Sequence, residues 1–283
     1  MARGMNALRR AANHNGPTAA VLLAAALPAL LGSVLLMRRE GLGTGLPIQQ
    51  VAAFIIAAVV GWTADSWVPR RGVPSKATLA WLLAISLFIP IVATDGDGPR
   101  RWLGAGPVRL YLAPMVLPSL LLTTFSSGWA GASLVIAVIA LWAQPDAAQA
   151  SALALAALAF ALTAPNGRVA SAVVTTILTG LALMTWQRPD PLAGVPHVEG
   201  VLRLAFQSGW LVGSAAVAAA LLPSVVLARV GSQRRDGRWL AVACYYAVLV
   251  ALAPLEVTPV PILGFGASPI LGYVAVAVIA RRR

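Results

Sequence analysis

Residues 18–37 read TAAVLLAAALPALLGSVLLM, a stretch without a charged side chain. A helix needs about 20 mostly apolar residues to cross the hydrocarbon core of a bilayer, so this stretch is long enough to span one. Further apolar runs follow at 47–66, 77–94, 108–125, 129–143, 149–164, 169–186, 203–228, 239–256 and 262–280. The sequence therefore predicts an all-α, polytopic membrane protein with about ten transmembrane helices.

The composition of the whole chain agrees with a membrane protein. Hydrophobic residues make up 59% of the 283 positions, charged residues make up only 11%, and the mean hydropathy is +0.81. A soluble domain carries roughly 25% charged residues. Because the loops between the apolar runs are short, we expect one membrane domain over 1–283 and no separate soluble domain.

The placement of the charges behind the net charge of +12 and the single cysteine argue against a nucleic-acid-binding surface and against a site built on cysteines. The basic residues lie in short loops rather than along a polar helix, which argues against nucleic acid as a partner. Cys244 stands alone in an apolar run, so the chain forms no internal disulfide and no zinc site built on cysteines.

Basic residues in the loops predict how the helices cross the membrane. Arg3, Arg9 and Arg10 precede the first apolar run, which lacks a small-x-small cleavage site and is expected to stay uncleaved. With the amino end in the cytoplasm, most Lys and Arg fall on the cytoplasmic side, as the positive-inside rule requires. The inner segments then include Arg70, Arg71, Lys76, Arg168, Arg229, Arg234, Arg235, Arg238 and Arg281 to Arg283. We expect a bacterial inner membrane protein with both termini in the cytoplasm.

The acidic residues show the opposite bias. Most of them fall on the expected outer side, namely Glu40, Asp95, Asp97, Asp146, Asp190, Glu199 and Glu256. Acids contribute little to topology. Chemistry on the outer face is therefore one explanation of this bias.

Three segments on the outer side carry residues suited to chemistry. The loop after the third run reads GPRRWL at 98–103, the turn into the sixth reads QPD at 144–146, and the last outer turn reads PLEVTPVPILGFGAS at 254–268. Arg100 and Arg101 suit an anionic ligand, because guanidinium groups bind phosphate through a fork of N–H groups. Asp146 is a functional candidate, because placing an acid inside a membrane costs about 2.5–3.5 kcal/mol.

In this order and at these helix positions, the three segments resemble the SEDS family, the RodA/FtsW type of cell-wall glycan polymerases. Members of that family have ten spans, a G-x-R-R-W stretch outside helix three, a Q-P-D at the start of helix six, and a stretch rich in proline and glycine near the end. In the last stretch this chain keeps Pro254, Pro259, Pro261, Gly266 and Ser268 at matching spacing. The resemblance covers about residues 98–281, and the first three helices match by hydropathy and order.

The family also has a segment H-T-D before its eighth helix, and the Asp is regarded as its catalytic carboxylate. Here the segment reads HVEGVLR at 197–203, so Glu199 falls where that Asp would be, and His197 and Gly213 are retained. A carboxylate at the outer end of a helix can act as a general base on a sugar hydroxyl. We expect burial to raise the pKa of Glu199, and Arg203, one turn further, to lower it. Glutamate is longer than aspartate, and a shift of ~1 Å can cost ~100-fold in rate.

The resemblance implies a peptidoglycan glycosyltransferase of cell division or elongation, with a lipid II-type polyprenyl-pyrophosphate disaccharide as donor. It implies Glu199 as the catalytic residue, and as substrate-binding residues Arg100, Arg101, Asp146, His197 and Ser268. The arginines or a divalent cation would meet the pyrophosphate charge, and no metal ligands are expected from the chain. The family works with a class B penicillin-binding protein, a single-span transpeptidase, which implies a partner in the membrane.

Departures from the family pattern keep other functions open. The Glu of the family's P-S-E entry to helix four falls on Pro114, its paired acids become Gln207 and Ser208, and the loop at 187–202 is much shorter. These changes favour a relative that binds the lipid carrier or the division and elongation machinery without polymerising. A flippase for the lipid-linked precursor is a third alternative. It predicts charged groups midway through the helices, and most spans have none at their centre.

Most of the candidate residues also have a simpler interpretation. Arg100 and Arg101 are equally compatible with a solvated loop or a lipid contact, and Asp146 with a helix cap. His197 is more typical of an ordinary loop residue than of a base. Glu199 is equally compatible with an exposed acid paired with Arg203 or Arg188, a kind of pair that contributes little to stability.

Overall fold

The computed structural model describes residues 19–67, 74–93, 100–105, 108–124, 130–163, 168–190, 192 and 194–281. Several residues used in the sequence argument lie outside the described residues. These are Arg3, Arg9, Arg10, Arg70, Arg71, Asp95, Asp97, Gly98, Pro99, Arg282 and Arg283.

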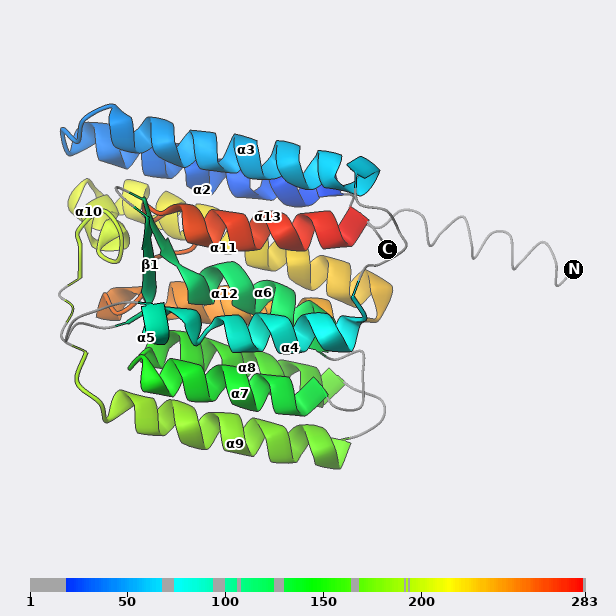
Figure 1. Ribbon diagram of the computed structural model, residues 1–283. Coiled ribbons are helices and arrows are strands. Elements are labelled where there is room, and N and C mark those ends of the chain that lie inside the picture. Colours follow the sequence, from blue (N-terminus) through cyan, green and yellow to red (C-terminus); the bar gives the residue numbers. More distant parts are fainter. Residues whose placement is uncertain are drawn as a thin grey trace, which may run out of the picture.

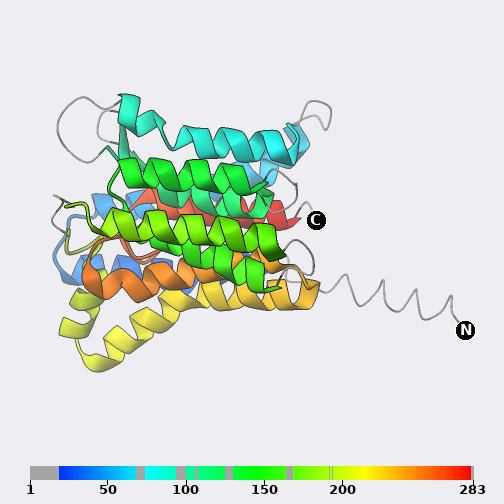
Figure 2. The same cartoon turned by 90° about the horizontal axis from the view of Figure 1, so that it is seen from below.

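The described chain is a bundle of helices that lie side by side along one direction (Figures 1 and 2). In chain order its elements are α2 (Ala19–Arg39), α3 (Gly45–Trp67), α4 (Lys76–Ser86), α5 (Ile89–Ala93), β1 (Trp102–Ala105), β2 (Val108–Tyr111), α6 (Leu112–Thr124), α7 (Ala130–Ala143), α8 (Ala147–Thr163), α9 (Arg168–Trp186), α10 (Val201–Gln207), α11 (Trp210–Arg234), α12 (Gly237–Leu252), the 3-10 turn η1 (Ala253–Leu255) and α13 (Ala267–Arg281). The all-α class is confirmed, and the one described sheet is the two-stranded hairpin β1–β2.

The helices have the length and polarity of membrane spans. In the described residues six helical segments are long and apolar enough to cross a membrane: Ala19–Arg39, Gly45–Thr63, Lys76–Ala93, Val169–Trp186, Trp210–Arg234 and Gly237–Leu255. Four apolar helices are shorter, namely Leu112–Thr124, Gly131–Ala143, Ala147–Thr163 and Ala267–Arg281. The chain is therefore a multi-pass helical membrane protein.

Large apolar side chains on the outside of the bundle fit a lipid surrounding. Leu35, Leu183 and Leu211 expose 67%, 62% and 84% of their surface. Such side chains are unfavourable in water and favourable in hydrocarbon, where helices also satisfy their own backbone hydrogen bonds. The interior is packed with small and aliphatic residues, and α12 contributes the largest fully buried side chains, Trp239, Tyr245 and Tyr246.

Several apolar runs adopt a different structure from the uninterrupted helices predicted from hydropathy. The run at 77–94 is divided between α4 and α5, and in the run at 262–280 the helix begins only at Ala267. The run at 108–125 begins as strand β2, and only Leu112–Thr124 is helical. The run at 203–228 is divided between α10 and α11, so the long helix begins at Trp210 instead of 203. Gly209 separates the two with a φ of +131°, a conformation that glycine adopts without the steric penalty of a Cβ. Hydropathy cannot detect such a break, because a single glycine barely changes the sum over a window.

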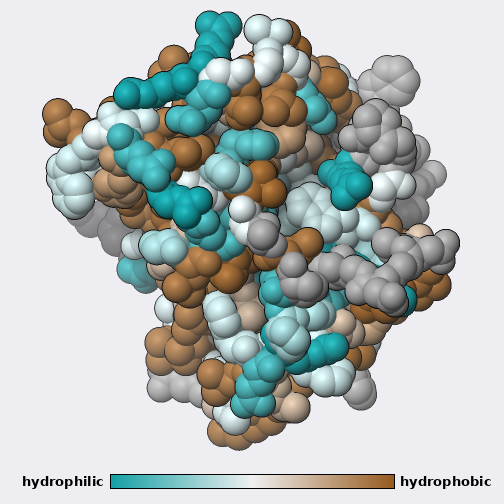
Figure 3. Space-filling view, turned by 90° about the vertical axis from the view of Figure 1, so that its left-hand side faces the viewer, coloured by the Kyte–Doolittle hydropathy of each residue, from teal (hydrophilic) through white to brown (hydrophobic). Residues whose placement is uncertain are grey.

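The two ends of the bundle differ in what they carry. The hairpin β1–β2, α10 and the segment 253–266 lie together at one end, which we call the hairpin end (Figure 1). Helix α2 begins, and α13 finishes, at the opposite end. Figure 3 looks onto the hairpin end and shows hydrophilic side chains interspersed with hydrophobic ones. The described residues of all three outer segments gather at this end, because Arg101 contacts Gln144 and Pro145 and the hairpin residue Tyr111 contacts Ser268.

Candidate functional site

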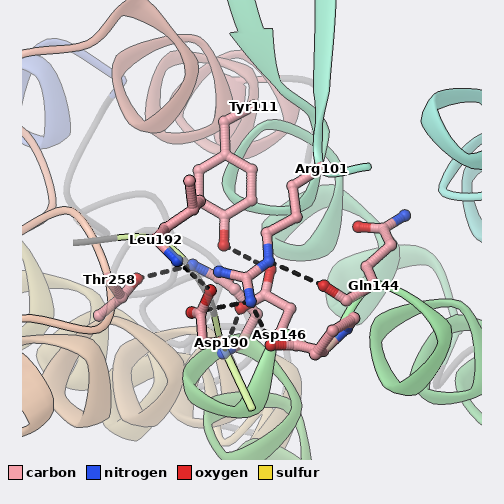
Figure 4. A network of polar contacts seen from close by, with 9 residues as sticks. Arg101, Tyr111, Gln144, Asp146, Asp190, Leu192 and Thr258 are labelled. Carbon is pink, nitrogen blue, oxygen red and sulfur yellow. Dashed lines mark hydrogen bonds and ion pairs between the residues drawn. The ribbon is translucent and has the colours of Figure 1, made fainter. Parts of the chain in front are cut away.

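The hairpin brings two polar side chains into the interior of the hairpin end. Trp102 pairs with Tyr111 in the antiparallel register, and their rings stack with centroids 4.8 Å apart. The backbone N–H of Leu112 donates to the carbonyl of Arg101 at 3.4 Å, which extends the pairing by one residue. Arg101, just before β1, and Tyr111, the last residue of β2, thus extend toward the same buried region (Figure 4).

Arg101 holds together three segments that are far apart in sequence. Its Nε donates to the carbonyl of Gln144 at 2.9 Å, and one terminal nitrogen donates to the carbonyl of Pro145 and to Asp190 Oδ2, the latter at 2.9 Å. Only 4% of the residue is exposed. Burial opposes its charge, but attraction to Asp146, Tyr111 and Asp190 outweighs this effect and raises the pKa of Arg101.

Asp146 is fully buried beside Arg101, just before α8. Its Oδ1 accepts the backbone N–H of Gln149 at 3.4 Å, as a helix-capping acid does, and its Oδ2 accepts the hydroxyl of Tyr111. The simpler interpretation as a cap is thus compatible with a place in the polar site. Burial raises the pKa of Asp146, although Arg101 and the hydrogen bond from Tyr111 act in the opposite direction. We call Arg101, Tyr111, Asp146 and Asp190 the polar cluster.

The segment 253–268 packs beside this cluster. The backbone N–H of Tyr111 donates to Ser268 Oγ at 2.8 Å, and Gln149 Nε2 donates to Thr258 Oγ1 at 3.2 Å. Gln50 of α3 donates to the carbonyls of Ile262 and Gly264, at 2.9 and 3.1 Å. The segment is therefore held in place by buried side chains of α3 and α8, and Ser268 is one of its anchors.

Glu199 lies on a tight turn between the segment after α9 and the start of α10. Its carboxylate accepts the backbone N–H of Val195 at 2.9 Å, and the side chain is half-buried. Burial raises the pKa of Glu199, while the hydrogen bond from Val195 and the charge of Arg101 lower it and Asp190 raises it further. Glu199 is thus close enough to the polar cluster for its proton affinity to depend on both charges of the Arg101–Asp190 pair.

Arg203 has a different partner from the one expected. We expected it to lower the pKa of Glu199, but its Nη1 contacts Glu256 Oε1 at 3.0 Å, and the basic group that acts on Glu199 is Arg101. Arg188 donates to the carbonyl of Trp142 and lies over its ring. The local turn at 195–200 directs the Glu199 carboxylate back to the amide of Val195, while the tertiary fold brings Glu256 to Arg203.

Among the residues proposed from the sequence, Asp146 and Ser268 both hydrogen-bond to Tyr111, and the charge of Asp146 acts on Arg101. Glu199 is influenced by the charge of Arg101. Arg100 is exposed and donates to the carbonyl of Ile91 at 3.0 Å, so it belongs to the contact with α5. The carbonyl of His197 accepts the N–H of Phe265 at 2.9 Å, and its ring lies 6.1 Å from that of Phe265. Burial lowers the pKa of His197.

Sequence reasoning missed three members of the site as functional residues. Tyr111, Gln50 and Gln149 lie in apolar runs and match no motif. Asp190 was visible only as one of the outer acids, and that bias was the signal that could have identified it.

Within the described ranges, no group of three or more His, Cys, Asp and Glu side chains could hold a metal ion. Comparison of the chain with models of known protein families and with curated proteins finds no match.

Proposed function

We propose that this chain is a SEDS-type glycosyltransferase of a bacterial inner membrane, with ten spans and the hairpin end on the outer face. The observation that carries the proposal is the position of Glu199. It is a half-buried carboxylate that accepts the backbone N–H of Val195, and its pKa is raised by burial and responds to the charges of Arg101 and Asp190. The motif order at 98–103, 144–146 and 254–268 supports the same function.

In the proposed reaction, Glu199 accepts the proton of the acceptor sugar's 4-hydroxyl. The oxygen then forms a bond to the anomeric carbon of a lipid II-type donor, and the bond from that carbon to the pyrophosphate breaks. The lipid pyrophosphate leaves with the electron pair, and positive charge near it stabilises the transition state. The raised pKa of Glu199 suits a base, because proton transfer is most effective when the pKa lies near the working pH.

Within this proposal Arg101 and Asp146 act mainly through Glu199. Arg101 is engaged by protein acceptors, so an incoming phosphate would compete with Asp190 for it. Its charge favours the ionised form of Glu199, and the charge of Asp146 stabilises the charged form of Arg101. Arg100, which is exposed and donates to the carbonyl of Ile91, would contact the pyrophosphate, whose charge a divalent cation would also offset.

A relative that binds the lipid carrier or its protein machinery without polymerising is the second candidate. The observation that favours it is Pro114, which takes the position of the family's glutamate and is buried in α6. A class B penicillin-binding protein would be the membrane partner in either case.

The test is glycan polymerisation by purified protein with a lipid II-type donor and the partner transpeptidase. We expect Glu199→Gln to lower the rate by about 100- to 10,000-fold, the usual contribution of a general base. The matched control is Glu40→Gln, the same change at an exposed position in the α2–α3 turn of the same end. The wild-type rate should rise with pH through the raised pKa, since the base must be deprotonated, and the residual rate of Glu199→Gln should not.

Equal rates for wild type and Glu199→Gln would remove Glu199 from the mechanism. An inactive wild type in the presence of its partner would favour the binding function.

A further inference from the structure

A groove of about 520 Å³ lies beside the candidate site, between α10, the first half of α11 and the last half of α12. Its volume is within the range of ligand pockets. Its walls are apolar and include Phe206, Val217, Leu221, Ala247 and Val250. Figure 2 shows α11 diverging from α12 toward the hairpin end, which is where these walls separate.

The groove changes from polar to apolar along its length. Its rim at the hairpin end is formed by Arg203 and Glu256, whose side chains pair at 3.0 Å. Leu221, on its wall, is eleven residues beyond Trp210, the first residue of α11. At 1.5 Å per residue it lies ~16 Å deeper, close to the middle of a hydrocarbon core ~30 Å thick. This polarity profile matches an amphiphile with its head at the membrane surface.

The rim belongs to the same segment as the candidate catalytic acid. Arg203 follows Glu199 by one helical turn, and Gly200 lies between them against the guanidinium of Arg203. The side chain of Arg203 is 54% exposed, so its guanidinium can accept a further partner. A phosphate bound by Arg203 would bring a sugar linked to it toward Glu199.

We propose that this groove binds the hydrocarbon chain of a polyprenyl phosphate lipid, with Arg203 contacting the phosphate and Glu256 competing with it. The proposal rests on the proposed function for the choice of lipid, because a single chain with a phosphate head is the part common to such donors. The groove volume of about 520 Å³ accommodates part of one hydrocarbon chain. A diacyl phospholipid would have to leave its second chain in the bilayer.

The test measures binding of heptaprenyl phosphate to the full chain in phosphatidylcholine nanodiscs, with bound lipid counted by native mass spectrometry. We expect Ala247→Trp, which fills the groove from α12, to weaken binding by about tenfold or more. Val217→Trp, from the opposite wall, should act in the same direction. The matched control is Val225→Trp on α11, which is 60% exposed and does not line the groove; it should bind as the wild type does.

The two rim residues give opposite expectations. Arg203→Gln should weaken binding of heptaprenyl phosphate by about tenfold, the loss of a charge-assisted contact. Glu256→Gln should strengthen it, because the competing carboxylate is gone. Neither should alter binding of heptaprenol, which has no phosphate. If the ion pair served only to hold the fold, both variants would weaken binding of both lipids.

Unchanged binding in Ala247→Trp and Val217→Trp, both with wild-type helicity, would overturn the proposal. So would equal displacement of heptaprenyl phosphate by dioleoylphosphatidylglycerol. Binding as expected without polymerisation would overturn the proposed function and leave the groove as a lipid site. Polymerisation by a protein whose groove variants bind normally would overturn the groove alone.

Discussion

Arg101 holds a positive charge inside the hairpin end, where little water can reach it. Two buried or half-buried carboxyl groups, Asp146 and Asp190, compensate this charge. Removing one partner of a buried ion pair leaves the other charge uncompensated, which is more destabilising than removing both. The polar cluster should therefore behave as a unit when it is mutated.

We expect Arg101→Met to lower the free energy of unfolding by about 3–5 kcal/mol. Adding Asp146→Asn should recover part of this loss, because a neutral amide then replaces the buried carboxylate that would otherwise lack the arginine. Denaturant unfolding of both proteins in detergent measures the difference as a double-mutant cycle. Additive losses would show that Arg101 and Asp146 do not interact.

The pKa of Asp146 also predicts how stability depends on pH. Burial raises it in the folded protein, so the folded state binds this proton more tightly than the unfolded state does. The stabilisation that this tighter proton binding contributes is fully present at a pH below the pKa of Asp146 in the unfolded chain. It is lost as the pH rises through the raised pKa of the folded protein. The melting temperature should therefore fall less steeply with rising pH in Asp146→Asn than in the wild type. Parallel curves would indicate an unperturbed carboxyl group.

Helices α6 and α13 approach each other closely beside the polar cluster. A Cβ on Gly272 of α13 would lie 2.1 Å from the carbonyl oxygen of Pro114 in α6. Small residues at such crossings allow helices in membranes to pack backbone against backbone. Ser268, one turn earlier on α13, holds Tyr111, so this crossing also positions the site.

We expect Gly272→Ala to destabilise the protein by about 1–3 kcal/mol, the usual cost of overpacking. Gly180→Ala in α9 is the matched control, because nothing lies within 4 Å of its Cβ position. It should be neutral or stabilising by about 0.5–1 kcal/mol, since alanine favours a helix. Thermal unfolding in detergent checks both, and equal effects would contradict the close crossing.

The arrangement of the whole chain bears on its orientation. Helix α2 begins and α13 finishes at the end opposite the hairpin end (Figure 1). The positive-inside rule predicts that the end where α2 begins and α13 finishes lies in the cytoplasm. The candidate site would then face outward, as the proposed function requires.

A cysteine-labelling experiment tests this orientation in a Cys244→Ala background. Gly43→Cys, in the exposed α2–α3 turn at the hairpin end, should react with an impermeable maleimide on intact spheroplasts. Gln233→Cys, exposed at the opposite end of α11, should react only after the membrane is permeabilised. The reverse pattern would place the hairpin end in the cytoplasm and exclude a role outside the cell.

The sequence alone determined the helical class, the approximate position of the apolar helices and the membrane surrounding. These follow from hydropathy, a sum over neighbouring residues that does not depend on the rest of the fold. It could also select Arg101, Asp146 and Glu199 as candidates, because their motifs are local.

Only the tertiary structure decided which of these side chains meet. Arg101 pairs with Asp190, 89 positions away, and Arg203 pairs with Glu256 instead of Glu199. The break at Gly209 and the hairpin that turns Tyr111 inward were equally invisible to hydropathy. A charged side chain in a membrane protein takes the partner that helix packing brings within reach, and that distance is a property of the folded bundle rather than of the neighbouring sequence.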